Sequence, residues 1–389
     1  MKKSVFFAFI IILIIFSMIA VVEAQDFDVG VEAAILVDAD TGQVLFEKNA
    51  DKKLPPASIT KIMTLLLAME EVEKGTVSLE DEVTISRFAE SMGGSQIFLA
   101  AGTRVKMGDL LKAVTIASAN DASVAVAETI AGTYSNFVSR MNKRAQELGM
   151  KNTHFVNSTG LPAKGGEHYS TARDISIMAR ELVKYPQILE WASIWVDYLQ
   201  LPNRKAMLVN TNKLIKDYPG MDGLKTGHTD AAGFCLAATA RRDNMRLISV
   251  IMNANSERER EEVTARLLDY GFNTFSKELV IKKGAQVQNI EVPGGKKTVT
   301  VAEAANDLYV LVKRGTKSSL TKKVIIKEDL KAPVKKGEIL GKEVVLQDEK
   351  VLGEVNLIAS EDIEKAGLLT RLWRAFVNWI GSLLKNVLG

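Results

Sequence analysis

The chain has 389 residues, more than one hydrophobic core usually organises, so we expect two domains besides any targeting segments. It carries 50 basic and 47 acidic residues, a net charge of +3, without a basic patch interleaved with aromatic residues. This balance argues against a nucleic-acid partner. A single cysteine, Cys235, excludes a disulfide scaffold. The three histidines lack the spacing of zinc motifs, so we expect no metal site.

The N-terminal residues have the pattern of an export signal. Two lysines precede an apolar run from Val5 to Val22, and small or aliphatic residues up to Ala24 occupy the positions that determine cleavage. We therefore predict a signal peptide over residues 1–24. Because the run approaches the length that spans a bilayer, an uncleaved signal anchor is the alternative. In both cases the rest of the chain is expected outside the cytoplasm, in the cell envelope.

Residues 25–275 have the alternating pattern of one α/β domain. Apolar runs at Ala33–Val37 and Gln43–Phe46 flank a turn signal and predict a hairpin, and Phe234–Ala240 with Met245–Met252 predict a second one. Three-to-four spacing predicts helices between them at Ile59–Glu70, Met107–Ser118, Asp121–Ile130 and Phe137–Leu148. Strands at both ends of a helical region predict a sheet that is closed by distant segments.

Residues 276–365 change in composition and predict a small β-rich domain with lysines on its surface. Short apolar runs are separated by glycine and proline at Gly294-Gly295, Pro333 and Gly337. The runs are Thr298–Val301, Val324–Ile326 and Val344–Leu346.

The last segment, residues 366–389, has the pattern of an amphipathic helix. Its polar positions step by three or four and leave a broad apolar face with two tryptophans. The polar positions are Arg371, Arg374, Asn378, Ser382 and Lys385. No charge-free run reaches the roughly 20 residues that span a bilayer, so we expect the helix to lie in a membrane interface. A terminal helix docked on the protein's own core is the alternative.

Ser58-Ile59-Thr60-Lys61 is a candidate nucleophile and base pair. It follows two prolines and precedes an apolar helix, so Ser58 and Lys61 are expected one turn apart on the same face. A neutral lysine amine can remove the proton of a serine hydroxyl if its surroundings lower its pKa. Taken alone, the pattern is more typical of a helix N-cap at Ser58.

Two further elements add polar groups. Ser118-Ala119-Asn120 lies between two helical segments, where serine can relay a proton and asparagine can hold an amide; a helix cap is the alternative. Lys225-Thr226-Gly227-His228-Thr229 precedes the second hairpin and is expected on an edge strand, to which an extended peptide could add. The alternative for this strand is a cationic edge that prevents aggregation.

The order and spacing of the three elements match the Ser-x-x-Lys, Ser-x-Asn and Lys-Thr-Gly signature of penicillin-binding enzymes. The chain resembles the low-molecular-mass penicillin-binding proteins that are D-alanyl-D-alanine carboxypeptidases. Matching blocks surround Ser58, Ser118 and Lys225, and two more contain His154-Phe155 with Gly160-Leu161 and Tyr169 to Asp174. With the signal, the β domain and the terminal helix, the resemblance covers essentially the whole chain.

The resemblance implies a serine β-lactamase/penicillin-binding-type catalytic domain, with an antiparallel sheet, flanking helices and a helical lobe. The expected substrates are peptidoglycan stem peptides that end in D-Ala-D-Ala, and β-lactam antibiotics should acylate the enzyme. No cofactor is implied. The expected location is the outer face of the cytoplasmic membrane.

The resemblance also implies roles for individual residues. Ser58 would be the acylated nucleophile, Lys61 its general base, and Ser118 the relay that passes a proton to the leaving D-alanine. Asn120 would hold the substrate amide, and the backbone N–H groups of Ser58 and His228 would form the oxyanion hole. The terminal carboxylate would be bound by Lys225, Thr226, Gly227, His228 and Thr229.

One position departs from the family pattern. Family members often carry an arginine shortly after the strand at Met245–Met252, where this chain has Asn253-Ala254-Asn255. Arg258 or Arg260 in the next helix could replace it, but the charge pattern favours ordinary solvated side chains for both.

Other functions are open to the same motifs. A β-lactamase needs a carboxylate that activates the deacylating water, and no Glu-x-x-Leu-Asn type segment lies between Asn120 and Lys225. A non-catalytic wall-binding protein is disfavoured by the intact Ser58 and Lys61 pair. Endopeptidase action on peptide cross-links is the alternative that the sequence leaves open.

Overall fold

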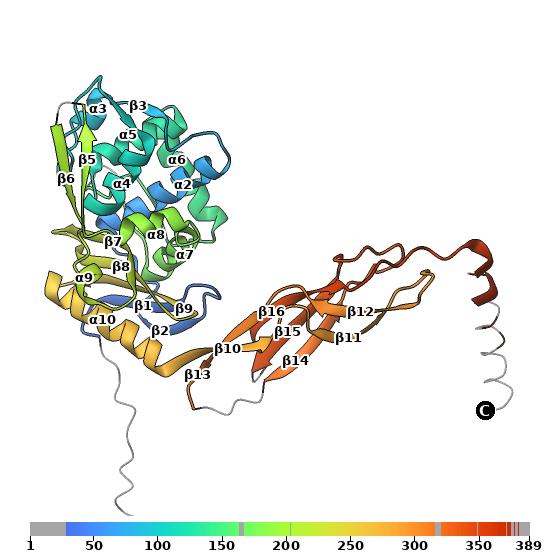
Figure 1. The fold of residues 1–389 in the computed structure, drawn as a ribbon. Coiled ribbons are helices and arrows are strands. Elements are labelled where there is room, and N and C mark those ends of the chain that lie inside the picture. The colour runs from blue at the N-terminus through green and yellow to red at the C-terminus, as the bar shows by residue number, and fades with distance from the viewer. Residues whose placement is uncertain are drawn as a thin grey trace, which may run out of the picture.

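The structure is a computed structural model, and Figure 1 shows its fold. It describes residues 29–162, 167–202, 204–315, 320–347, 349–370, 372–374, 377 and 380. The predicted signal over residues 1–24 lies outside the described residues.

A five-stranded antiparallel sheet forms the centre of the first domain, in the order β2-β1-β9-β8-β7. The strands are β1 (Ala33–Asp38), β2 (Val44–Lys48), β7 (Met221–Thr229), β8 (Gly233–Arg242) and β9 (Met245–Ala254). Both predicted hairpins are confirmed. The N-terminal hairpin pairs with β9 through β1, so segments more than 200 residues apart close one sheet. Strand β7 lies at the edge, as its sequence predicted.

Helices cover both faces of this sheet (Figure 1). Helix α7 (Ala172–Leu182) packs against β1 and β9 from the helical lobe, and α10 (Glu257–Thr274) packs against the other face. Ile35 and Val37 of β1 therefore contact the large core of the lobe, whereas Leu36 contacts the core beneath α10. A strand buried on both faces needs a continuous apolar run, which explains its sequence.

The helical lobe contains the four helices expected from periodicity. The remaining helices are η1 (Ala57–Thr60), α2 (Lys61–Glu73), α3 (Arg87–Glu90), α4 (Met107–Ala117), α5 (Asn120–Ala131), α6 (Tyr134–Glu147), α8 (Pro186–Ala192) and α9 (Leu214–Asp217). Two small antiparallel ribbons complete the domain: β3 (Glu82–Thr84) with β4 (Arg104–Lys106), and β5 (Val196–Leu201) with β6 (Arg204–Val209).

The second domain is built from β-strands, as predicted. One sheet pairs β10 (Phe275–Ile281) with β13 (Leu308–Lys313), and a five-stranded sheet has the order β11-β12-β16-β15-β14. The latter strands are β11 (Gln286–Glu291), β12 (Val299–Ala304), β14 (Thr321–Ile326), β15 (Ile339–Gln347) and β16 (Lys350–Ala359). Two separate apolar clusters form its core.

A buried ion pair between Lys277 and Asp38 fastens the start of the second domain to the first. Helix α10 leads directly into β10, and Lys277 of β10 lies against the turn after β1. Its ammonium group is 3.2 Å from the Asp38 carboxylate and also contacts Asp40. The Lys277 side chain is only 3 % exposed, so it is shielded from solvent screening.

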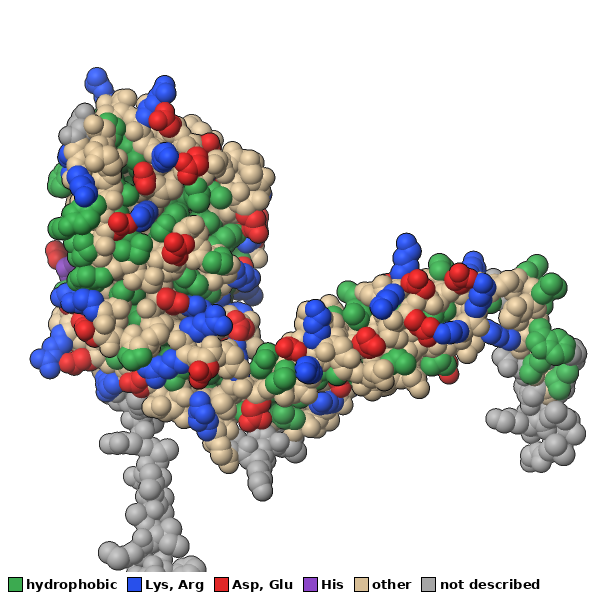
Figure 2. Space-filling view, viewed as in Figure 1, with side chains coloured by type: hydrophobic (Ala, Val, Ile, Leu, Met, Phe, Trp, Pro, Cys, Tyr) green, Lys and Arg blue, Asp and Glu red, His purple; other side chains and the backbone are tan. Residues whose placement is uncertain are grey.

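The terminal segment begins a helix at Leu368, beyond the second domain (Figure 1). Its described apolar side chains are exposed, including Leu369 at 83 % and Trp373 at 66 % (Figure 2). This argues against docking of these residues on the protein's own core. Arg374 donates hydrogen bonds of 2.7 Å to the carbonyls of Gly295 and Lys296 at the end of the second domain. Among the described residues, no helix is both long and apolar enough to cross a membrane.

Candidate active site

Ser58 and Lys61 contact one another where the chain enters α2. Ser58 lies in the 3-10 turn η1, and Lys61 is the first residue of α2, one turn later. Lys61 Nζ is 2.9 Å from Ser58 Oγ and donates a second hydrogen bond of 2.9 Å to the Thr159 carbonyl. Neither η1 nor α2 has a side-chain N-cap, so the cap interpretation of Ser58 is wrong.

The surroundings of Lys61 favour its neutral form. The side chain is fully buried, and this desolvation lowers its pKa well below the usual range. The charge of Lys225 lowers the pKa further, whereas Asp121 opposes the shift. A neutral amine within hydrogen-bond distance of a hydroxyl can accept its proton, so the pair has the chemistry of a base and its nucleophile.

Ser118 and Asn120 lie in the short connection between α4 and α5. Ser118 ends α4 with left-handed backbone angles (φ 60°, ψ 30°), and the N-cap of α5 is Ala119, without a side-chain hydrogen bond. Ser118 is thus the C-cap of α4 and Asn120 begins α5, as the helix-cap alternative expected, but no side chain of Ser118-Ala119-Asn120 caps the N-terminus of α5. Asn120 Nδ2 donates to the Gly93 carbonyl over 2.7 Å, while its buried Oδ1 has no partner among the described residues. That oxygen can accept an N–H from a ligand.

A loop that sequence reasoning did not identify holds Asn120 in place. The backbone N–H of Asn120 donates to the Ser95 carbonyl over 2.7 Å. The carboxylate of Asp121 accepts from the N–H groups of Ile97 and Leu99, at 3.0 to 3.2 Å. Asp121 thus binds the 93–99 loop and fixes it beside the start of α5.

Strand β7 passes directly beside the Ser58 turn at Gly227. A Cβ atom placed on Gly227 would lie 2.9 Å from the Pro56 carbonyl oxygen and 3.1 Å from Ala57 Cβ. Only glycine fits without displacing the turn before the nucleophile. Strand β7 and the turn that carries Ser58 are therefore in contact, although their motifs lie far apart in the sequence.

Lys225 does not form a solvent-facing cationic edge, because its side chain is 1 % exposed and faces inward. Burial lowers its pKa to about 7, and the charge of Arg260 adds to the shift. Its ammonium group donates to the Thr226 carbonyl over 3.1 Å. Thr226 Oγ1 is 2.6 Å from the Thr211 hydroxyl, a partner that no motif indicated.

His228 and Thr229 end the same strand. His228 is exposed, with its ring centroid 4.1 Å from that of Phe234 on β8. Thr229 Oγ1 accepts a 3.1 Å hydrogen bond from the N–H of Ala232 and so caps the turn between β7 and β8.

Arg258 and Arg260 have different environments. The Arg258 side chain is 87 % exposed and pairs with Glu262, which confirms a solvated charge. Arg260 is 4 % exposed, so that expectation was wrong for this residue. It contacts Glu257 and Glu261 at 3.2 Å, and its Nε has no partner among the described residues. Arg260 belongs to α10, which packs against the sheet, and its positive charge acts on Lys225 of the edge strand.

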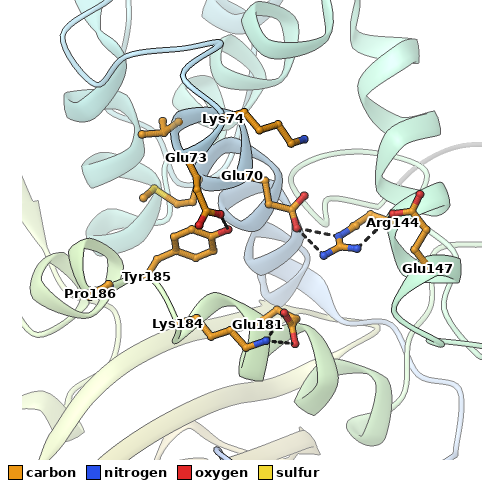
Figure 3. A pocket seen from close by; sticks show the side chains of 11 residues that line it. Glu70, Glu73, Lys74, Arg144, Glu147, Glu181, Lys184, Tyr185 and Pro186 are labelled. Carbon is orange, nitrogen blue, oxygen red and sulfur yellow. Dashed lines mark hydrogen bonds and ion pairs between the residues drawn. The ribbon is translucent and has the colours of Figure 1, made fainter. Parts of the chain in front are cut away.

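A cavity of about 700 Å³ lies elsewhere, at the C-terminal end of α2 (Figure 3). Several of its charged groups are paired with one another: Arg144 binds Glu70 and Glu147, and Lys184 binds Glu181. The turn before Ser58 and the end of β7 instead border a smaller hollow of about 180 Å³, lined in part by Pro56, Ala57, Gly160 and Thr229. Chemistry, and not the size of a cavity, therefore selects the candidate active site.

The antiparallel sheet, the helical lobe and the serine–lysine pair at the start of a helix define a penicillin-recognising serine hydrolase. The family model "D-alanyl-D-alanine carboxypeptidase" matches residues 20–256, and "Penicillin-binding protein 5, C-terminal domain" matches residues 275–365. The chain is 44 % identical over 350 residues to D-alanyl-D-alanine carboxypeptidase DacF of Bacillus subtilis, covering 90 % of each chain.

Solved structures agree with this assignment. Penicillin binding protein 5 from Haemophilus influenzae is 32 % identical with a TM-score of 0.74, covering 87 % of this chain and 98 % of that one. Penicillin-Binding Protein D2 from Listeria monocytogenes, in an ampicillin-bound form, is 32 % identical with a TM-score of 0.57, covering 62 % and 98 %. The chain belongs to the D-alanyl-D-alanine carboxypeptidase family, and it is a serine-type carboxypeptidase of the low-molecular-mass penicillin-binding group.

Proposed function

We propose that Ser58 is the residue acylated by the stem peptide. Lys61 accepts the Ser58 proton as Oγ attacks the carbonyl of the penultimate D-alanine. The C–N bond then breaks, and the leaving D-alanine amine takes up a proton that Ser118 relays. Water hydrolyses the ester and regenerates Ser58. The observation that carries this proposal is the 2.9 Å contact between Ser58 Oγ and the buried, pKa-depressed amine of Lys61.

The remaining motif residues bind and orient the substrate. Asn120 Oδ1 accepts the amide N–H of the peptide, which gives this buried oxygen a partner. Lys225, with Thr226 and the following residues of β7 to Thr229, receives the terminal carboxylate as the peptide lies along the edge strand. The N–H groups of Ser58 and His228 bind the carbonyl oxygen as negative charge develops on it.

The division of the chain supports a tethered enzyme. We propose a signal at 1–24, a catalytic domain at 25–275, a β domain at 276–365 and a membrane-binding helix at 366–389. Exposed Leu368, Leu369 and Trp373 support the last assignment, because so much apolar surface beside Arg374 suits a membrane interface. The enzyme would then act at the outer face of the cytoplasmic membrane.

We expect penicillin to form an adduct on Ser58 that lasts far longer than the peptide acyl group. The opened drug stays attached where D-alanine would leave, so it hinders the approach of water. Among the described residues, no carboxylate is hydrogen-bonded to Ser58 or Lys61, where it could position a base for that water. Lack of a positioned base costs about 10²–10⁴ in rate. Intact mass of the purified protein, followed over time beside D-alanine release from a D-Ala-D-Ala peptide, measures both reactions.

The same experiment separates the competing enzymes. Rapid, repeated turnover of penicillin would identify a β-lactamase. Cleavage of peptide cross-links in preference to release of D-alanine would identify an endopeptidase. A protein that forms no adduct and releases no D-alanine would contradict the proposed chemistry at Ser58 altogether.

A second expectation concerns the tether. Truncation after Gly367 should release the signal-processed protein from membranes and leave its activity on soluble peptides unchanged. Ala366 is kept because it is buried and its N–H binds the Gly294 carbonyl. Burial of the apolar face contributes about 25 cal/mol per Å² removed from water, which sums to several kcal/mol. Sedimentation with vesicles measures the effect, with Arg374→Ala as a control for the contact to the β domain. Continued membrane binding by the truncated protein would place the anchor elsewhere.

A further inference from the structure

His168 is a partly buried residue that none of the signature motifs includes. It precedes the short antiparallel bridge between His154 and Tyr169, and its ring packs edge-on against Phe155 at 5.8 Å. It also lines the 180 Å³ hollow beside the Ser58 turn. A histidine so close to a nucleophile that uses a lysine as base needs a different explanation from general-base catalysis.

The two ring nitrogens of His168 have defined partners. The backbone N–H of Val156 donates to Nδ1 over 3.3 Å, and Nε2 is 2.8 Å from Thr60 Oγ1. A backbone N–H can only donate, so Nδ1 is the acceptor and the proton of the neutral ring is on Nε2. Burial lowers the pKa of His168 to about 4, so the ring is neutral near pH 7. Nε2–H therefore donates to the Thr60 hydroxyl.

Thr60 connects this histidine to the nucleophile. It is the last residue of η1, between Ser58 and Lys61, and its side chain is fully buried. A Cβ atom on Gly160 would lie 2.9 Å from Thr60 Oγ1 and 1.8 Å from the Ala57 carbonyl oxygen. The loop at Gly160 is thus pressed against the turn that carries Ser58.

The same loop also holds the base. Thr159, the residue before Gly160, accepts the hydrogen bond from Lys61 Nζ. The Thr60 hydroxyl lies at the centre of this packing, and among the described residues His168 is its hydrogen-bond partner. Ser58, Thr60 and Lys61 belong to one tight turn. A shift of Thr60 would therefore move Ser58 and Lys61 relative to the Thr159 carbonyl.

We propose that His168 is a positioning residue: its Nε2–H holds Thr60, and through Thr60 keeps Ser58 and Lys61 in the geometry needed for acylation. The inference rests on the proposed role of Ser58. His168 itself neither touches the reacting atoms nor exchanges a proton in the reaction. Its contribution comes from alignment, where an error of about 1 Å can cost on the order of 10² in rate.

Two substitutions at His168 separate the roles of its nitrogens. In His168→Gln the amide N–H₂ can occupy the place of Nε2 and donate to Thr60. In His168→Asn the shorter side chain can meet the Val156 N–H but cannot reach Thr60. We expect the acylation rate with penicillin to stay within about 3-fold of wild type for Gln, and to fall roughly 10–100-fold for Asn. The affinity for the unreacted drug should change little, so the loss appears in the chemical step.

Thr60→Val tests the connection, because it removes the hydroxyl and keeps the shape. It should lower acylation as much as His168→Asn, and the double variant should be no slower than either single one. His154→Gln is the matched control, because His154 Nδ1 binds the Glu167 carbonyl in the same segment without reaching η1. Its acylation rate should equal that of wild type.

Several results would overturn the inference: equal rates for the Gln and Asn variants, an additive double variant, or a His154→Gln loss as large as that of His168→Asn. Circular dichroism shows whether His168→Asn folds. If it does not fold, the test rests on His168→Gln and Thr60→Val. Slow acylation of His168→Gln, or a wild-type acylation rate for Thr60→Val, then rejects the inference. Failure of the wild-type protein to be acylated would instead reject the proposed role of Ser58.

Discussion

Ser58→Ala is expected to lose both D-alanine release and penicillin labelling, with a fall in turnover on the order of 10⁶, the effect of removing the nucleophile in another serine hydrolase. Among the described residues, no other serine hydroxyl has a hydrogen bond to a lysine amine. The substitution removes one hydroxyl and leaves the Lys61 bond to the Thr159 carbonyl in place, so the fold should persist. Intact mass after incubation with penicillin and a D-alanine assay provide the two measurements.

A matched control for this experiment is Ser176→Ala. Ser176 is buried, and its hydroxyl donates to the Arg173 carbonyl within α7, outside the three motifs. This variant should label and turn over like the wild-type enzyme. Full labelling of Ser58→Ala would mean that another residue forms the acyl-enzyme.

Substitution of Lys61 should have the second-largest effect, a fall in acylation of about 10²–10⁴-fold, the usual contribution of a positioned base. Lys61→Met removes the amine and keeps the length of the side chain. Lys61→Arg keeps a positive charge that cannot be removed at neutral pH, because the arginine pKa exceeds 12. Both should be equally slow if Lys61 works as a neutral base. Stopped-flow or quenched labelling with penicillin measures the rate.

Two controls accompany the Lys61 substitutions: a lysine at the opposite end of the same helix, and the pH dependence of acylation. Lys74→Met changes an exposed lysine just beyond α2, and it should leave acylation unchanged. In the wild-type enzyme, acylation should slow as the pH falls, because protonation of Lys61 removes the lone pair that accepts the Ser58 proton. A Lys61→Arg variant with substantial activity would show that Lys61 acts through its charge and not as a base.

Local patterns in the sequence were sufficient to predict both hairpins of the first domain, four of its helices and the motif residues. Apolar runs on either side of a turn predicted β1 with β2 and β8 with β9, because each strand in a hairpin finds its partner a few residues away. The turn between Ser58 and Lys61 could be predicted because helical geometry alone places residues three apart on one face.

Interactions between distant segments could not be predicted in the same way. Thr159 binds the Lys61 amine across 98 residues, and His168 binds Thr60 across 108. No periodicity marks either residue, because a backbone carbonyl is available at every position and a histidine occurs in many environments. The block that contains Gly160-Leu161 was the one sequence signal near Thr159, and it did not indicate that Thr159 contacts Lys61.

The sequence by itself determined which chemical groups this enzyme has: a serine and a lysine one turn apart, an amide, and a lysine beside a glycine on an edge strand. Only the tertiary structure decided their chemical state. Burial among segments from the whole domain lowers the pKa of Lys61 and Lys225, and it removes Arg260 from solvent although Arg258, two residues earlier, is exposed. Desolvation depends on every neighbour in space, so a pattern of residues along the chain cannot specify it.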